Sequence, residues 1–322
     1  MSTLWDICLL VAGLTSLIIG ADLLVRGAAE LATRAGISSF VVGLTVVAFG
    51  TSMPELAAGV RAAVQDRGEL VIGAVVGSNT ANVALILGTT ALIWPVRVRS
   101  AVVRREAPMM LAVSFFGAGA LMGGQISRLE GAILSAGLLA FIAITALSAR
   151  KKDVSQAEWV VEQPPGLGRL LRFGPKLAIA LALLLGLGAL VGGAELVVDS
   201  SERIARSLGV SETVIGISMV AVGTSLPELA TCVMAALRKH SEIVVGNVLG
   251  SNIFNILCVL GVSSLAQPLR VPPETMWRDA PWMLGFAVAC LPIMAARLCI
   301  GRLEGAVLLI AYAAYLWLVW SG

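Results

Sequence analysis

The sequence predicts an all-α polytopic membrane protein with ten transmembrane helices, arranged as two inverted five-helix repeats. Three observations support this fold class: the apolar composition, ten long apolar runs and an internal duplication. Apolar residues make up 58% of the 322 residues and charged residues 13%, and the mean hydropathy is +0.92. Soluble domains are about 45–50% apolar and about 25% charged. The chain therefore has too few polar groups for a water-exposed surface, and its first expected partner is a lipid bilayer.

Each apolar run is long enough to cross the hydrocarbon core, which takes about 20 mainly apolar residues in a helix. Backbone that faces lipid must satisfy its own hydrogen bonds, so we expect helices that break only where protein or a cavity covers the break. The N-terminal run lacks the basic residues that begin a signal peptide, and we interpret it as a retained span. The expected spans are residues 4–25, 38–62, 70–94, 103–123, 129–148, 176–197, 211–237, 242–266, 279–296 and 303–320.

The longest polar stretch divides the chain into a first repeat (1–148), a linker (149–175) and a second repeat (176–322). Ten spans put both termini on one side, which then carries seven of the 23 Lys and Arg residues, leaving 23 − 7 = 16 for the other side. Cytoplasmic loops are enriched in Lys and Arg. We therefore expect an inner (plasma) membrane protein with a cytoplasmic linker and both termini outside. The seven are Arg61, Arg67, Arg128, Arg203, Arg206, Arg270 and Arg278.

The duplication is visible as two matched segments. Residues 20–55 align with 193–228 at an offset of 173, with 16 identities in 36 positions, and residues 71–95 align with 244–268 with 11 identities in 25. Each repeat then holds five spans, so the second repeat begins on the opposite side of the membrane. The halves must be inverted, an architecture common in secondary transporters, whose substrate sites lie near the midplane between the repeats. A duplicated scaffold without transport is the alternative.

The first signature segment reads Gly-Thr-Ser-Met-Pro-Glu at residues 50–55 and Gly-Thr-Ser-Leu-Pro-Glu at 223–228. A carboxylate in the middle of a span is expensive and indicates a functional site. The proline has no N–H, so the carbonyl four residues earlier loses its helical donor. Each repeat thus brings a carboxylate, two hydroxyls and freed carbonyls together, and such hard oxygen ligands suit calcium and sodium.

The second signature segment begins Gly-Ser-Asn at residues 77–79 and 250–252. Ser78 and Asn82 are four residues apart and share a helix face, as do Ser251 and Asn255. These faces could complete an oxygen cage around an ion. Hydroxyls in membrane helices also serve helix packing, and for Ser52 or Ser225 alone that reading has similar weight.

Glu55 and Glu228 have no basic partner inside the expected spans. Two facing carboxylates without a cation repel each other, and one of them would take up a proton. A bound divalent ion removes that repulsion. The pair therefore favours a cation site over a purely structural role.

These two segments and the five-plus-five repeat resemble the calcium/cation antiporter superfamily, most closely its prokaryotic sodium/calcium exchangers, over essentially the whole chain. The resemblance implies ten helices, of which the second, third, seventh and eighth enclose the ion sites, while the first and sixth slide against the rest. It implies calcium binding by Glu55 and Glu228 with the backbone carbonyls of Thr51 and Thr224. It implies sodium sites that use the same glutamates with Ser52, Ser78, Ser225, Ser251, Asn82, Asn255 and the carbonyls of Ala48 and Ala221.

One position departs from the family pattern. Several prokaryotic members carry an aspartate where this chain has Asn255. The amide is neutral and cannot titrate, so the site holds two formal charges instead of three. The ion stoichiometry and any part played by protons or potassium stay open.

The sequence thus favours a secondary antiporter that exchanges calcium for sodium by alternating access, with no cofactor and no obligatory protein partner. A calcium/proton antiporter is the nearest alternative, and a passive cation channel is a more distant one. The basic residues are scattered, which speaks against nucleic acid as a partner. An enzyme is not expected, because the only histidine, His240, lies in a turn and no nucleophile–base set is visible. The five cysteines lie in apolar runs, and we interpret them as small buried hydrophobic residues.

Overall fold

The computed structural model describes residues 3–149, 174–208 and 223–321, so most of the linker, the start of the seventh expected span and Ala221 lie outside the described residues. The described chain is helical apart from four two-residue strands. The elements, with π-helical segments labelled η, are α1 (Thr3–Ala35), α2 (Ser39–Val42), η1 (Gly43–Val47), α3 (Ala48–Thr51), α4 (Met53–Val64), α5 (Gly68–Ala81), η2 (Asn82–Ile86), α6 (Leu87–Ile93), β1 (Val96–Arg97), α7 (Ser100–Arg104), α8 (Glu106–Leu121), β2 (Gln125–Ile126), α9 (Arg128–Ala149), α11 (Pro175–Ser207), α13 (Leu226–Leu237), α14 (Ser241–Phe254), η4 (Asn255–Leu260), α15 (Gly261–Ala266), β3 (Leu269–Arg270), η5 (Thr275–Asp279), α16 (Ala280–Arg297), β4 (Cys299–Ile300) and α17 (Arg302–Ser321).

The described residues form a multi-pass helical membrane protein. Seven helical stretches are long and apolar enough to span a bilayer, and the bent pair of α2–α3 with α4 makes an eighth. The fourth expected span corresponds to α8, a helix of 16 residues. The seventh is represented by α13, with the rest of it among the residues that the structure does not describe. The count of ten spans therefore stays a prediction.

The first helix is longer than the expected first span, because α1 continues to Ala35. The added segment is rich in alanine, a strong helix former, and Arg34 Nε lies 2.5 Å from Glu30 Oε1, one turn away. Gly36, with a φ of +66°, then ends the helix in the left-handed conformation that glycine adopts without strain. The length of the apolar run therefore underestimates the length of this helix, because residues with high helix propensity continue beyond the apolar ones.

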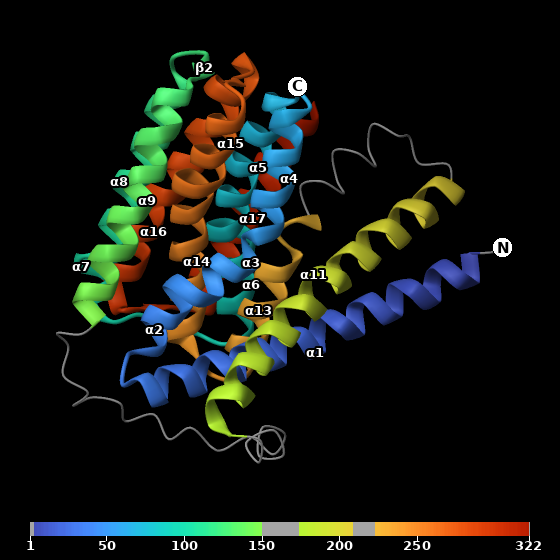
Figure 1. Ribbon diagram of the computed structural model, residues 1–322, viewed down its shortest axis with the longest axis vertical. Helices are drawn as coiled ribbons and strands as arrows, with labels where there is room; N and C mark the ends of the chain where they lie inside the picture. Colours follow the sequence, from blue (N-terminus) through green and yellow to red (C-terminus); the bar gives the residue numbers. More distant parts are fainter. Residues whose placement is uncertain (1–2, 150–173, 209–222, 322) are drawn as a thin grey trace.

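The helices α1 and α11 have 33 residues each, about 50 Å at 1.5 Å per residue. That exceeds the hydrocarbon thickness of about 30 Å, and a long helix adapts by tilting. In Figure 1 the two helices lie side by side and lean away from the axis of the remaining helices. They form a unit that is distinct in direction from the main bundle.

Equivalent glycines of the two repeats bring α1 and α11 into close contact. A Cβ added to Gly20 would lie 2.7 Å from the carbonyl oxygen of Gly186, and one added to Gly193 would lie 2.9 Å from that of Gly13. At the offset of 173, Gly13 is equivalent to Gly186 and Gly20 to Gly193. Reciprocal contacts of this kind are what a two-fold axis generates.

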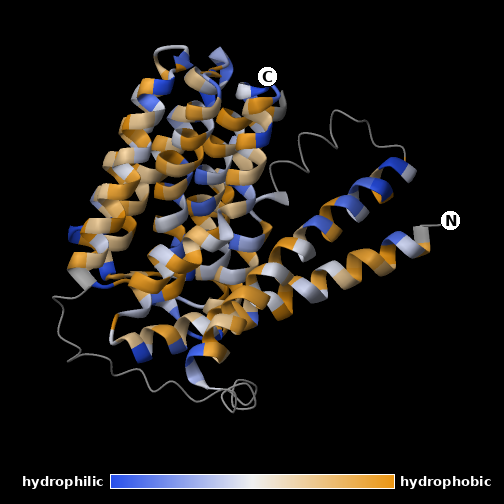
Figure 2. Cartoon of the chain, viewed as in Figure 1, coloured by the Kyte–Doolittle hydropathy of each residue, from blue (hydrophilic) through white to orange (hydrophobic). Residues whose placement is uncertain are grey.

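The centre of the main bundle is formed by α14. Within Ser241–Ala266, all residues of an apolar stretch of 18 residues are buried in the molecule, whereas in Arg302–Val319 only 17% of the residues are buried. Gly250 permits this central position, because a Cβ there would lie 2.6 Å from the Cβ of Ala48. Hydrophilic residues gather at the helix ends and inside the bundle, and apolar residues cover the outer helices (Figure 2).

Two short β ladders correct the all-α prediction. β1 pairs with β4 in antiparallel register, with Val96 opposite Ile300, and β2 pairs with β3, with Ile126 opposite Leu269. Proline stops the preceding helices at residues 95 and 268. The extended residues that follow then pair across the repeats, which a prediction from hydropathy cannot detect.

The cysteines are all free, and the prediction that all of them are buried is confirmed for three, holds in part for Cys299 and is wrong for Cys8. Cys232, Cys258 and Cys290 are buried and Cys299 is half-buried, but Cys8 is exposed. Cys8 lies on α1, whose outer surface would face lipid, so an apolar sequence context does not imply burial in protein.

Candidate functional site

Each Pro-Glu segment follows a break in its helix. Ser52 separates α3 from α4 with φ −85° and ψ 4°, and Ser225 precedes α13 with φ −88° and ψ 1°. The first pair of helices bends by 41° at this point. The break predicted from Pro54 is therefore present, and Ser225 has the same backbone conformation at the equivalent position. Both glutamates lie in the first turn of the helix that follows the break.

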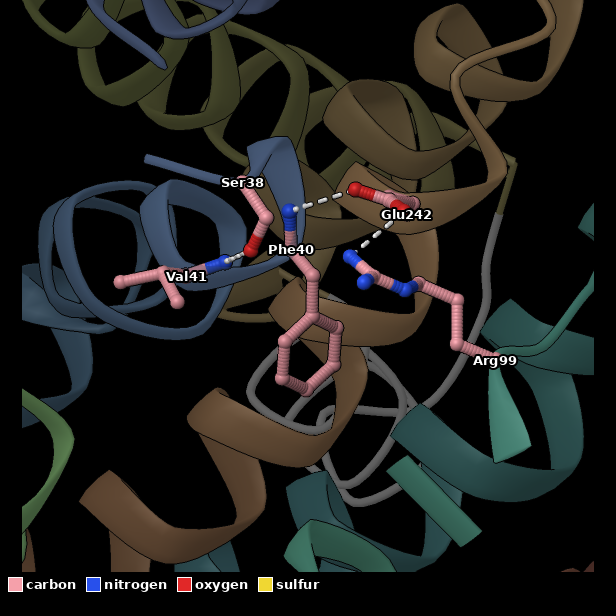
Figure 3. A network of polar contacts seen from close by, with 5 residues as sticks. All are labelled: Ser38, Phe40, Val41, Arg99 and Glu242. Carbon is pink, nitrogen blue, oxygen red and sulfur yellow. Dashed lines mark hydrogen bonds and ion pairs between the residues drawn. The ribbon is translucent and has the colours of Figure 1, made fainter. Parts of the chain in front are cut away.

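A polar network fixes the start of the helix that leads to the first break. The Ser38 hydroxyl accepts a hydrogen bond from the backbone N–H of Val41, which is a normal N-cap. Glu242, at the start of α14, accepts the N–H of Phe40 at 3.2 Å and the guanidinium of Arg99 at 3.3 Å (Figure 3). The N–H of Phe40, which the first turn leaves without a backbone partner, is thus satisfied by the second repeat.

The two carboxylates are buried without a basic partner. Glu55 is 5% exposed and Glu228 is 2% exposed. Neither belongs to an ion pair among the residues that the structure describes. In each, Oε2 is buried and has no hydrogen-bond partner within the described part of the chain. Because burying a lone carboxylate costs several kcal/mol, this arrangement is one that a cation would stabilise.

Hydroxyl groups connect the two repeats at the site. Ser52 Oγ donates to Glu228 Oε1 at 3.2 Å, and Ser225 Oγ lies 3.3 Å from Ser78 Oγ. These four residues are 5% exposed or less. Side chains of the first break therefore contact the second repeat, and those of the second break contact the first.

Asparagines also form hydrogen bonds between the two repeats. Asn255 Nδ2 donates to Asn79 Oδ1 at 3.0 Å, and Asn79 Nδ2 donates to the carbonyl of Asn252 at 3.3 Å. Among the described residues, Asn255 Oδ1, Ser251 Oγ and Asn82 Nδ2 are buried and lack partners. The cluster thus holds polar atoms that are available to a further ligand.

The threonines at the two breaks differ in burial, and one expected ligand before the second break lies outside the described residues. Thr51 and Ala48 are fully buried, whereas Thr224 is half-buried and makes a contact of its own. Ala221 lies outside the described residues. The remaining expected ligands are all at most 5% exposed, namely Glu55, Glu228, Ser52, Ser78, Ser225, Ser251, Asn82 and Asn255.

Sequence reasoning missed Asn247. This residue is fully buried in α14, accepts a hydrogen bond from Thr51 Oγ1 at 3.3 Å and donates one to Cys232 Sγ at 3.2 Å. A signal was present, because Asn247 is a lone amide in an apolar run and its repeat-equivalent is Ala74. It was not used because it belongs to neither signature segment.

Two asparagines of the cluster also begin unusual turns. η2 starts at Asn82 and η4 starts at Asn255, the equivalent position. Single π-helical turns inside α-helices are frequent at functional sites. Periodicity at 3.6 residues per turn does not reveal them, since the sequence around them continues the apolar pattern.

The chemistry of the cluster is that of a hard-cation site. Its groups are two carboxylates, hydroxyls and amides, and such oxygens suit sodium and calcium. Groups of three or more His, Cys, Asp or Glu that could hold a metal are absent from residues 3–149, 174–208 and 223–321. Neutral oxygens would therefore supply most of the ligands.

Comparison with known proteins points the same way. A family model described as "Sodium/calcium exchanger protein" matches residues 5–147 and 178–321. The chain is 36% identical over 316 residues to "Putative antiporter CaxA" of Alkalimonas amylolytica, covering 96% of this chain and 97% of the relative. It is 35% identical over 337 residues to "Sodium/calcium exchanger MaX1" of Methanosarcina acetivorans, covering 96% of both chains.

A solved structure and a third relative extend the likeness. A structure of the sodium-calcium exchanger NCX_Mj, soaked with sodium and strontium, superposes with a TM-score of 0.82 at 30% identity, covering 98% of this chain and 99% of the other. "Inner membrane protein YrbG" of Escherichia coli is 37% identical over 281 residues, covering 86% of this chain and 84% of the relative. The relatives named as antiporter or exchanger are transporters and not enzymes. From its sequence, its helical fold and these matches, the chain belongs to the sodium/calcium exchanger family of cation antiporters.

Proposed function

We propose that the chain exchanges calcium for sodium at the cluster around Glu55 and Glu228. The observation that carries the proposal is the pair of buried carboxylates, one from each repeat, each with an unpartnered oxygen among the described residues. Two carboxylates balance one calcium ion. Sodium ions would use the same glutamates and the neighbouring hydroxyls, so the two ions would compete for one cage.

The assignment of ligands follows from this proposal. Calcium would bind Glu55 and Glu228 with the carbonyls of Thr51 and Thr224. Sodium would use these glutamates with Ser52, Ser78, Ser225, Ser251, Asn82, Asn255 and the carbonyls of Ala48 and Ala221. The printed names of the sodium/calcium exchangers MaX1 and NCX_Mj support the choice of ions.

Competition for one cage would couple the two fluxes. A loaded cage has its central charge neutralised and can change access between the two sides. An empty cage holds two bare carboxylates, whose desolvation costs several kcal/mol each. Exchange is then favoured over leak. Ten spans in two inverted repeats, the inner membrane and a cytoplasmic linker complete the proposed architecture, and the reciprocal glycine contacts of α1 and α11 support the inversion.

The test is calcium uptake into liposomes that contain the purified protein and are loaded with sodium. On dilution into sodium-free buffer, radioactive calcium should enter, and it should not enter without the sodium gradient. Glu55→Gln and Glu228→Gln each remove half of the site charge and should reduce uptake to the background of empty liposomes.

Other outcomes identify the rival functions. Uptake driven only by an imposed pH gradient would replace the proposal with calcium/proton exchange. Uptake without any gradient requirement would indicate a channel. The hydroxyl-rich breaks favour sodium over the proton, because a proton needs only the carboxylates.

A further inference from the structure

Asn247 occupies a position between the two breaks that the ligand assignment does not use. Its side chain is fully buried at the centre of the bundle. The amide oxygen accepts from the hydroxyl of Thr51, at the end of α3, and the amide nitrogen donates to the thiol sulfur of Cys232, in α13. Cys232 lies four residues after Glu228, one helical turn along the same face. One amide thus joins a proposed ligand of the first repeat to the helix that carries the glutamate of the second.

This connection exists in one half of the molecule only. The repeat-equivalent of Asn247 is Ala74, and that of Cys232 is Gly59. Neither alanine nor glycine has a polar side chain, so the equivalent link to Thr224 cannot form. The asymmetry agrees with the burial of the two threonines, since Thr51 is fully buried and Thr224 is half-buried.

The hydrogen bonds have a direct consequence for the carbonyl oxygens of the break. The Thr51 hydroxyl has one proton, and its acceptors in reach include Asn247 Oδ1 at 3.3 Å and the carbonyl of Ala48 at 3.4 Å, besides the Glu228 carboxylate. Cys232 sulfur accepts from the amide nitrogen, which turns the amide oxygen toward Thr51. The Ala48 carbonyl also accepts the backbone N–H of Ser52 at 3.0 Å. With the Thr51 proton shared toward Asn247, this carbonyl keeps its second lone pair for another partner.

We propose that Asn247 is a positioning residue for the cation site: it holds Thr51, whose carbonyl would bind calcium, and it leaves the second lone pair of the Ala48 carbonyl for sodium. The inference rests on the proposed exchange function and adds to it a residue outside the two signature segments. Without Asn247, the Thr51 hydroxyl turns to Ala48, and two oxygens that would face the ion are displaced or occupied. Asn247 acts through Thr51 and does not itself contact the ion.

The experiment measures the calcium concentration dependence of sodium-driven uptake in liposomes for single and double variants. For Asn247→Ala we expect the KM for calcium to rise about five- to tenfold, which corresponds to the loss of one buried hydrogen bond. The maximal rate should stay within about twofold of the wild-type rate. Thr51→Val keeps the backbone carbonyl and removes the hydroxyl, so it should give a similar rise. The KM for calcium of the double variant should not exceed that of the more impaired single variant, because both changes remove the same interaction.

Two further variants separate positioning from general stability. Asn247→Asp keeps the volume and the acceptor oxygen, and it should hold KM for calcium at or below the wild-type value. Thr90→Val removes another fully buried hydroxyl, which bonds only within its own helix, and should leave KM unchanged. If Asn247→Ala cannot be purified, the other two variants still provide the test: Thr51→Val should raise the KM for calcium, and Asn247→Asp should not.

The results distinguish this inference from the function on which it rests. Multiplicative effects in the double variant, or an Asn247→Asp variant as impaired as Asn247→Ala, would overturn the positioning role while leaving exchange intact. A wild-type protein without sodium-driven calcium uptake, and without calcium binding by calorimetry in detergent, would overturn both.

Discussion

The proposed cation site carries only two formal charges. Glu55 and Glu228 supply both of them, and Asn255 supplies a neutral amide that donates to Asn79 Oδ1 at 3.0 Å. The amide oxygen of Asn255 has no partner among the described residues and is buried. A carboxylate at the same position would add a third charge to the site and a group that can bind a proton.

Asn255→Asp should make calcium binding depend on pH more steeply than in the wild-type protein. A carboxylate close to two others takes up a proton readily, so near pH 6 the variant would resemble the neutral amide and have a similar KM for calcium. Near pH 8 the added charge would lower KM severalfold. Uptake in liposomes at both pH values checks this, and equal KM ratios between variant and wild type at the two pH values would contradict it.

At the scale of elements, α1 is connected to two different partners. Asp6 of α1 lies 2.6 Å from Arg203 of α11, within the tilted pair. Asp22 of α1 contacts Arg238, which follows α13 in the main bundle. If the α1–α11 pair moves as a unit, the first contact persists during transport and the second must open.

Cross-linking tests this movement with a matched control. Cysteines at positions 22 and 238, bridged by a short bifunctional maleimide in a chain that otherwise keeps only the buried Cys232, should stop calcium uptake, because they tie α1 to the main bundle. Cysteines at positions 6 and 203, bridged in the same way, should leave uptake largely unchanged. Transport that survives the first bridge, or is lost equally with both, would show that the pair does not move as a unit.

The whole molecule presents an apolar exterior with charges at its helix ends (Figure 2). Its orientation in the membrane follows from the proposed distribution of Lys and Arg, seven on the side of the termini and 16 on the side of the linker. The charge difference favours a cytoplasmic linker.

Labelling of single cysteines in intact cells measures the orientation. In a cysteine-free chain, Ser2→Cys should react with a membrane-impermeant maleimide and Ser155→Cys should react only after the cells are permeabilised. The reverse pattern would invert the topology. Reaction of both in intact cells would contradict the odd number of spans, five, that is expected between these two positions, provided that total labelling after permeabilisation is equal.

The sequence by itself determined the membrane class, the duplication, the helix break before each Pro-Glu pair and the two central carboxylates. These features are local: an apolar run, a proline without an N–H and a carboxylate in an apolar context have the same physical consequences in any helix that crosses lipid. The family resemblance added the expected ligand set, whose described members are buried except for the half-buried Thr224.

Only the tertiary structure decided which side chains meet. Ser52 contacts Glu228 and Thr51 contacts Asn247, although these partners are 176 and 196 residues apart in the chain. The length and tilt of α1, the paired strands and the exposure of Cys8 were likewise decided by packing. The physical reason is that a pattern along one helix specifies which face is polar, whereas the approach of two helices, here permitted by Gly250 beside Ala48, determines which polar groups bond.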